Sequence, residues 1–174
     1  IFGLATGLFF FFLDIQWIQA DVPASIMDFR NDTISFHYLS DTIPAFLSTA
    51  NICDKNGNFL FFTNGIYVRD RFGNKMPNGD SLSFNNQEYY AAVTTSGAPN
   101  DQSVMILPKP GSSTIYYIFH FLPIDTIFTI AGRTYLQPIN FFYSIVDMTQ
   151  NFGLGDVVQK NKKLQLHLSF FVFF

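Results

Sequence analysis

The chain has 174 residues, which suits one ordinary domain with a sizeable core or part of a larger protein. Its 23 Phe and 8 Tyr predict an all-β fold, because aromatic rings pack well on pleated sheets and lose rotamer freedom in helices. The formal net charge of −3, without a basic stripe, argues against a nucleic acid as a partner.

The first 20 residues are more apolar than the rest of the chain. The apolar run 1–13 is too short for a membrane-spanning helix, which needs ~20 residues. Residues 1–20 therefore resemble the remnant of an export signal, and an antiparallel β domain is expected over 21–174. A second interpretation stays open, in which Trp17 and Ile18 belong to the first strand and cleavage falls nearer residue 13.

Two similar turn sequences follow one another in the centre of the chain. Asp54-Lys55-Asn56-Gly57-Asn58 and Asp70-Arg71-Phe72-Gly73-Asn74 each predict a hairpin in which Asp opens a type I turn and Gly takes the left-handed position. Asn64-Gly65, between them, predicts a tighter two-residue turn. Strands of this β-meander are expected at 50–53, 59–63 and 66–69. The residues assigned to these turns and the next one are Asp54, Asn56, Gly57, Asn64, Gly65, Asp70, Gly73, Asn78 and Gly79.

Beyond the meander, turn and strand signals continue and helical periodicity is absent. The polar segment 80–102 predicts a long surface excursion, and 123–138 predicts another loop. Further strands are expected at 103–107, 114–122, 139–148 and 157–158, and in a last stretch where Leu164, Leu166, Leu168 and Phe170 share one face. The chain as a whole predicts antiparallel meander sheets.

Several of these runs carry a family resemblance. They are 52–68, Met76-Pro77-Asn78-Gly79, Ile106-Leu107-Pro108-Lys109-Pro110-Gly111 with 116–120, 143–148, and Gly153-Leu154-Gly155-Asp156 with 157–161. In this order, over roughly residues 26 to 164, the chain resembles the N-terminal propeller-like region of exported proteins of gliding bacteria. Such proteins often end in a sorting domain read by the type nine secretion system. The resemblance implies secretion or attachment to the outer cell surface.

The resemblance also implies an incomplete β-propeller. A propeller blade takes ~40 to 50 residues, so the chain holds about three to four blades, too few for most closed rings. We therefore expect a fragment of a larger propeller, with the missing remainder of its own chain as one partner.

No motif in the sequence identifies a catalytic reaction or a cofactor site. Asp54, Asn56 and Asn58 alternate as in calcium loops, but the positions where an EF-hand needs Gly and Glu hold Phe59 and Gly65. An EF-hand is therefore excluded. A calcium site formed by this turn and another loop stays open, and no other cofactor is expected.

Histidine and cysteine are spaced without a metal pattern. His37, His120 and His167 lie far apart and Cys53 is alone, so neither a zinc site nor an internal disulfide is expected. His120 falls within an aromatic strand and is interpreted as a core histidine. A Ser-His-Asp set stays open, because its members can come from anywhere in a chain, but no Gly-x-Ser-x-Gly elbow is present.

Two classes of function fit this sequence. Glu88 is the only Glu and the twelve Asp mostly occupy turn positions, which favours a non-catalytic extracellular or cell-surface module that presents loops to a glycan or protein. Its contact candidates are the loop aromatics Tyr89, Tyr90, Phe128 and Tyr135. The alternative is a secreted, glycan-directed hydrolase with an Asp-based site among the loops. Carboxylates converging with a His in one pocket would favour the hydrolase, and carboxylates dispersed over turns favour the module.

Four hydroxyl residues are candidates for O-glycosylation. Thr33, Thr42, Ser81 and Thr126 each follow an Asp and precede Ile or Leu. This tripeptide resembles the acceptor motif used by the same group of bacteria, so modification is expected only if the chain is exported.

Overall fold

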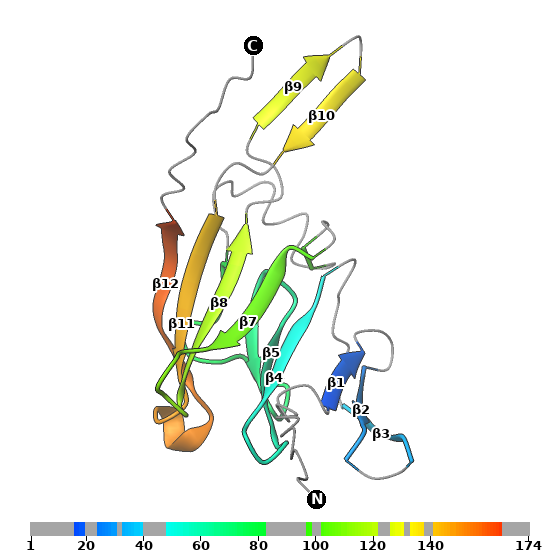
Figure 1. The fold of residues 1–174 in the computed structure, drawn as a ribbon, viewed down its shortest axis with the longest axis vertical. Helices are drawn as coiled ribbons and strands as arrows, with labels where there is room; N and C mark the ends of the chain where they lie inside the picture. The colour runs from blue at the N-terminus through cyan, green and yellow to red at the C-terminus, as the bar shows by residue number, and fades with distance from the viewer. Residues whose placement is uncertain are drawn as a thin grey trace, which may run out of the picture.

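The computed structural model describes residues 16–19, 24–30, 33–39, 48–82, 97–98, 102–121 and 141–164, and the backbone of 126–130 and 133–137. These residues form antiparallel strands, with a 3-10 turn at Asn151–Gly153 and no α-helix among them (Figure 1). The prediction of an all-β antiparallel fold is confirmed. In the part of the chain that the structure describes, there is no helix of the length and apolar character that a bilayer crossing requires.

Three sheets follow one another along the chain. The N-terminal sheet has the order β1-β2-β3, with strands Gln16–Gln19, Ser25–Asp28 and Ser35–Tyr38. The middle sheet has the order β4-β5-β6, with strands Ala50–Cys53, Phe59–Thr63 and Val68–Asp70. The four-stranded sheet has the order β12-β11-β8-β7, with strands Asp156–Leu164, Phe141–Asp147, Ile115–Phe121 and Val104–Pro108. All three are open sheets of antiparallel pairs.

A separate hairpin is inserted between β8 and β11. It consists of β9 (Thr126–Ile130) and β10 (Arg133–Gln137) (Figure 1). The prediction of a loop over 123–138 is therefore wrong. The prolines at both ends of this segment are typical loop punctuation, but the β-branched and aromatic residues between them favour strands.

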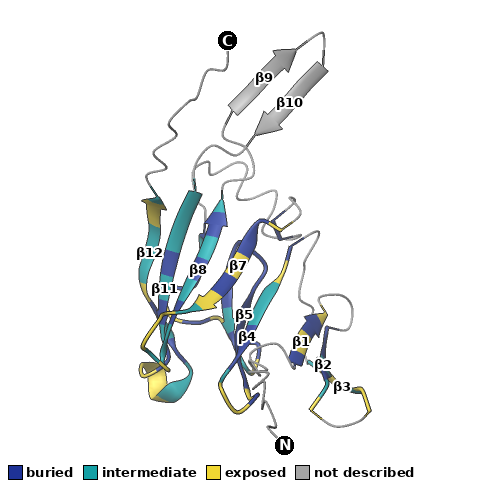
Figure 2. Ribbon diagram, viewed as in Figure 1, coloured by how far each residue is buried: buried dark blue, intermediate teal, exposed yellow. Residues whose placement is uncertain are grey.

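The middle sheet is buried on both faces. Phe61 belongs to the core that this sheet shares with the four-stranded sheet, where its ring packs edge-on against Tyr116. Phe62 belongs to a second core, shared with Ile18 and Ile26 of the N-terminal sheet. All residues of β5 are consequently buried (Figure 2), which explains why this strand is a continuous apolar run instead of an alternating one.

The first strands of the three sheets are neighbours, since β1 lies beside β4 and β4 lies beside β7. Asn51 of β4 joins the first pair: its side chain accepts the N–H of Ile18 at 3.0 Å and donates to the carbonyl of Gln16 at 2.6 Å. Before β4 and β7, the N–H of Ser103 donates to the Ser48 hydroxyl at 2.9 Å. The sheets are therefore stacked in chain order through their first strands.

At the opposite edge, segment 75–82 ties the middle sheet to β12, and these contacts are termed the edge clamp. They run from Val157 N to Pro77 O (3.1 Å), from Asn78 Nδ2 to Val157 O (2.6 Å), from Lys160 Nζ to Asp80 O (2.9 Å) and from Asn161 Nδ2 to Ser81 O (2.9 Å). The turn predicted at Asn78 and Gly79 is closed by a bond from Gly79 N to Met76 O at 2.8 Å. The run 76–79 thus serves the contact between two sheets as well as a turn.

The connection at Asn64-Gly65 is wider than predicted. Thr63 pairs with Val68, so four residues connect β5 and β6 instead of two. Gly65 lies at φ 82°, but Asn64 stays outside the left-handed region that a two-residue turn of this kind needs. The Asn64 side chain instead accepts the N–H of Ile66 and of the next residue, both at 3.1 Å. The strand predicted to begin at residue 66 therefore begins at Val68.

The segment 80–102 is described only at 80–82, 97–98 and its last residue. Leu82 and Ala98 are buried there, and their N–H groups donate to Ile66 O and Asn64 O, both at 2.9 Å. The prediction of a surface excursion is wrong at these two anchors, which return the chain to the core.

Both ends of the described fold bear on the predicted boundaries. Trp17 and Ile18 lie in β1, which pairs with β2, as the second interpretation of the N-terminal segment requires. Residues 1–15 lie outside the described residues, so the export signal stays a prediction. Strand β12 extends to Leu164, with register shifts against β11 and Asn161 at φ 54°. The predicted alternation at Leu166, Leu168 and Phe170 lies outside the described residues as well.

Candidate functional site

Asp54 organises the turn between β4 and β5. Its Oδ1 accepts the N–H groups of Asn56 (2.8 Å) and Asn58 (2.9 Å), and its Oδ2 accepts Asn58 Nδ2 (2.9 Å). Gly57 lies at φ 80°, a conformation that favours a residue without Cβ. Partial burial works to raise the pKa of Asp54, but the hydrogen bonds from Asn58 and Asn56 outweigh it, and the pKa is lowered overall. The carboxylate is therefore held ionised in one position.

Asp70 builds a second turn of the same form after β6. Its Oδ1 accepts the N–H groups of Phe72 and Asn74, both at 2.9 Å, and Gly73 lies at φ 85°. The N–H of Asp70 donates to Asn74 O at 2.9 Å, which closes the turn. The turns at 54–58 and 70–74 are termed the twin turns.

Three of the other described carboxylates, Asp28, Asp80 and Asp147, have partners outside the twin turns, and the fourth, Asp156 of β12, is the register partner of Asp147. Asp147 caps the turn after β11, and the backbone hydrogen bond it accepts there lowers its pKa. Asp28 is buried against Arg30, whose hydrogen bonds hold the pKa of Asp28 far below its usual range, and Asp80 lies 3.4 Å from the Lys160 ammonium. Among the described residues, no three Asp, Glu, His or Cys side chains gather where they could hold a metal.

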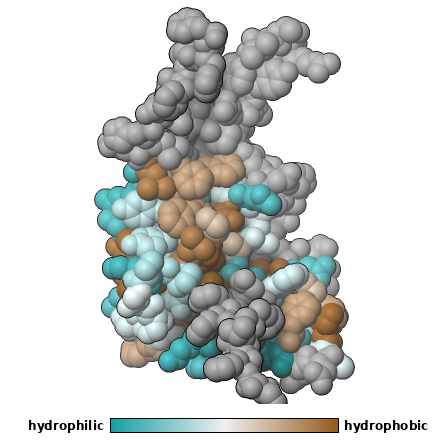
Figure 3. Space-filling view, in the orientation of Figure 1, coloured by the Kyte–Doolittle hydropathy of each residue, from teal (hydrophilic) through white to brown (hydrophobic). Residues whose placement is uncertain are grey.

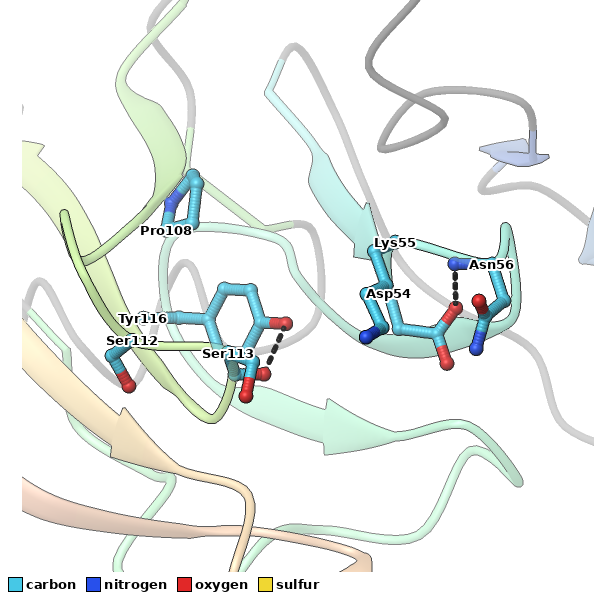
Figure 4. A pocket seen from close by; sticks show the side chains of 7 residues that line it. All are labelled: Asp54, Lys55, Asn56, Pro108, Ser112, Ser113 and Tyr116. Atoms are coloured by element: carbon cyan, nitrogen blue, oxygen red, sulfur yellow. Dashed lines mark hydrogen bonds between the residues drawn. The ribbon is translucent and has the colours of Figure 1, made fainter.

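A cleft of about 340 Å³ opens between the first twin turn and the turn that joins β7 to β8 (Figure 4). It is lined by Asp54, Lys55, Asn56, Pro108, Ser112, Ser113 and Tyr116. The second turn is closed by a bond from Lys109 N to Ile115 O at 2.9 Å, with Gly111 at φ 77°. The cleft therefore lies across the boundary between the middle and four-stranded sheets.

Tyr116 forms the aromatic wall of the cleft. Figure 4 shows its side chain extending from β8 toward the turn that carries Asp54 and Lys55. The ring packs edge-on against Phe61, with 5.6 Å between centroids, and the hydroxyl donates to Ser113 O at 3.3 Å. Burial raises the pKa of Tyr116, and the nearby Asp54 charge raises it further, so the phenol is a protonated donor at neutral pH.

The donor set of the cleft fits a polar organic ligand better than a cation. Asp54 is the one carboxylate among its lining residues, and its oxygens already accept three N–H groups. The second turn adds the hydroxyls of Ser112 and Ser113, whereas calcium takes ~6 to 8 oxygen ligands with several carboxylates among them. This pairing of loops is therefore a poor calcium site.

Apolar side chains also gather on the face of the four-stranded sheet that points away from the middle sheet, termed the outward face (Figure 3). Its groove is lined by Tyr117, Phe119, Tyr143, Ile145 and Leu164. The Tyr117 ring lies 5.9 Å from the rings of both Phe119 and Tyr143. These side chains are half-buried, and apolar faces that stay partly open in this way mark contact surfaces.

The N-terminal sheet carries a corresponding face at the other end of the stack. Trp17, Phe36 and Tyr38 are 52%, 51% and 71% exposed and lie on the side opposite to Ile18 and Ile26. Both ends of the stack therefore present aromatic side chains to the solvent.

His120 is buried within the four-stranded sheet. Its Nε2 lies 3.0 Å from the Ser144 hydroxyl, which also accepts the N–H of Asn161 at 3.1 Å. Burial lowers the pKa of His120 to about 4, so the ring is neutral at pH 7. The interpretation of a core histidine is confirmed. His37 is exposed, with Nε2 3.7 Å from an Asp28 carboxylate oxygen.

The predicted ligand contacts are only partly within the described residues. Tyr89, Tyr90 and Glu88 lie outside them. Phe128 of β9 and Tyr135 of β10 are register partners in the inserted hairpin. The role of these tyrosines and of Phe128 as ligand contacts stays a prediction.

The predicted modification sites differ in their surroundings. Thr33 is exposed, whereas Ser81 is half-buried and its carbonyl belongs to the edge clamp. Thr126 begins β9, and Thr42 lies outside the described residues, as does His167. Of Thr33 and Ser81, Thr33 is therefore the more accessible acceptor for a glycan.

The sequence did not single out the cleft. Lys55 lies in the predicted turn 54–58 and Tyr116 in the predicted strand 114–122, whereas Pro108, Ser112 and Ser113 lie between two predicted strands. Local signals predict the turn at 54–58 and the two strands that flank 108–113, but the proximity of the two turns depends on how the middle and four-stranded sheets stack. The outward face had a local signal, since the predicted strands 114–122 and 139–148 carry aromatic residues at alternate positions.

Comparisons of this chain with protein-family models, with curated proteins and with solved structures found no match.

Proposed function

We propose that this chain is a non-catalytic interaction module of an exported, cell-surface protein, which presents its turns to a glycan or protein partner. The observation that carries this proposal is the use of five of the six described carboxylates. The sixth, Asp156, is the register partner of Asp147. Asp54, Asp70 and Asp147 bond backbone N–H groups in separate turns, and Asp28 and Asp80 are taken up by cationic side chains. Hydrolysis by an Asp-based site needs two carboxylates on either side of one scissile bond, and the cleft is lined by one.

We further propose that the three sheets are successive blades of a β-propeller. Blades are antiparallel sheets arranged around a common axis, and the sequential stacking through β1, β4 and β7 supports such an arrangement. Met76 N donates to Val68 O at 3.0 Å, so segment 75–79 runs along β6 where a fourth blade strand would lie.

The remainder of the parent chain is the proposed partner of the two aromatic ends. The middle sheet packs against another sheet on both faces, whereas among the described residues the four-stranded sheet and the N-terminal sheet each pack against another sheet on one face only. Further blades would bury both surfaces in the way that the middle sheet is buried. Surface turns such as the twin turns would stay free for ligands.

The test compares binding with turnover. The purified chain is applied to a glycan array and, in parallel, to a panel of chromogenic glycosides and esters. We expect retention of at least one class of glycan and no turnover above the buffer blank. Turnover that disappears when one Asp of this chain is replaced by Asn would contradict the proposal and favour the hydrolase.

A further inference from the structure

We propose that the cleft between the turns 54–58 and 108–113 binds one neutral pyranose ring of a glycan. This inference rests on the proposed function and names the ligand class and the site. Neither turn suffices alone, because the lining residues come from two sheets.

The size of the cleft sets the first limit. Small-molecule pockets span ~300 to 1,000 Å³, and this cleft, at about 340 Å³, lies at the lower end. A single sugar ring with its exocyclic groups fits such a volume, whereas an extended peptide or a nucleotide would lie mostly outside it.

The lining of the cleft combines an apolar part with hydrogen-bonding groups, as a sugar ring combines C–H groups with hydroxyls. Pro108 supplies an apolar wall suited to the C–H face of a pyranose, and the Tyr116 ring, which is 3% exposed, closes the cleft behind it. The Asn56 amide both donates and accepts, and Asp54 Oδ2, which accepts Asn58 Nδ2, retains acceptor capacity for a ligand hydroxyl. The neighbouring hydroxyl groups of a sugar each donate and accept hydrogen bonds, so they can pair with both the Asn56 amide and Asp54 Oδ2.

The charges of the cleft favour a neutral ligand. Asp54 is held ionised by its turn, so an anionic sugar would place its carboxylate near a fixed negative charge. Lys55 supplies the balancing positive charge from the same turn. An uncharged ring avoids both the repulsion and the cost of desolvating a second ion.

The polar groups are also fixed before binding. Asp54 is held by three hydrogen bonds, and Tyr116 is held by Phe61 and by its bond to Ser113 O. Groups already held in place lose little conformational freedom when a ligand arrives, so more of the contact energy contributes to affinity.

The experiment uses methyl glycosides of glucose, galactose, mannose and N-acetylglucosamine as probes, with saturation-transfer NMR to detect binding and titration to obtain Kd. Asn56→Ala and Tyr116→Phe each remove hydrogen-bonding groups from the cleft. We expect at least one glycoside to bind, and each variant to weaken it about five- to tenfold. The matched control is Phe72→Ala, which changes the equivalent position of the second twin turn and is expected to leave Kd unchanged.

Two results would overturn the site. Either none of the four glycosides binds, or binding is the same in wild type, Asn56→Ala and Tyr116→Phe. Thermal unfolding verifies that each variant is folded, and if Tyr116→Phe does not fold, Asn56→Ala and Ser113→Ala at exposed positions decide the question. Failure here with retained glycan-array binding would leave the proposed function standing, whereas turnover of a glycoside would contradict the proposed function itself.

Discussion

At the residue scale, His120 shows how burial changes the chemistry of one side chain. The ring is fully buried, lies 3.0 Å from the Ser144 hydroxyl and stacks beside Phe142. Since the surroundings disfavour the imidazolium, burial lowers the pKa of His120 to about 4. A histidine in this environment is part of the core and does not serve as a proton shuttle at neutral pH.

The first prediction is a loss of stability in mild acid. The pKa of His120 is about 4 when folded, against 6.5 for an unperturbed histidine, so the unfolded chain binds the proton more tightly. The contribution of neutral His120 to the free energy of unfolding is about 3 kcal/mol. It is complete above pH 6.5, falls as the pH drops and is lost below pH 4. Urea unfolding at several pH values measures it. His120→Gln, which does not titrate, should flatten the curve between pH 6.5 and 4, and an unchanged slope would contradict the assignment to His120.

At the element scale, the edge clamp explains why a short turn sequence contains a glycine. A Cβ on Gly79 would lie 2.7 Å from Met76 O and 2.9 Å from Val68 O. Both carbonyls accept hydrogen bonds in the same region, from Gly79 N and Met76 N, so neither can move without loss of a bond. The glycine is therefore required by a close approach of backbone, and the clamp to β12 depends on it.

The second prediction compares two glycines. Gly79→Ala should destabilise the fold by about 2–3 kcal/mol, because the added methyl group meets backbone atoms that cannot give way. Gly73→Ala is the control: it lies at φ 85° in the second twin turn, and a Cβ there meets nothing within 4 Å. Its cost is limited to left-handed strain of about 1 kcal/mol. Chemical denaturation of both variants tests the order, and an equal or smaller loss for Gly79→Ala would be inconsistent with the clamp geometry.

At the scale of the whole molecule, the two faces of β8 have different surroundings. Ile118 is fully buried in the core shared with the middle sheet, whereas its neighbour Phe119 lines the groove of the outward face. One strand thus carries both an internal contact and a surface that the described residues leave partly open. The stack of sheets could extend at this surface without any change inside it.

The third prediction separates these two roles. Ile118→Ala should cost about 2–5 kcal/mol, because it leaves a cavity between two sheets. Phe119→Ala, the neighbouring substitution on the opposite face, should cost less than half of that in the isolated chain. Urea unfolding of both variants measures the difference. Equal losses would mean that the outward face is already covered.

Much of the fold follows from local chemistry. Asp, Asn and Gly at 54–58 and 70–74 determine their turns by themselves, since the side chain bonds its own neighbouring N–H groups. The same locality explains the errors. The prolines Pro123 and Pro138 predict a loop where the hairpin β9–β10 forms. Asn64 and Gly65 predict a two-residue turn, whereas the Asn64 side chain accepts two backbone N–H groups within a four-residue connection.

The sequence by itself determined the all-β class, the antiparallel order and the turn role of Asp54 and Asp70, because each depends on neighbours along the chain. Only the tertiary structure decided that β1, β4 and β7 lie side by side, that 76–79 clamps β12, and that Tyr116 meets Asp54 across a cleft. These contacts join segments far apart in sequence. Their positions depend on which sheet faces pack together, and local propensity carries no information about that choice.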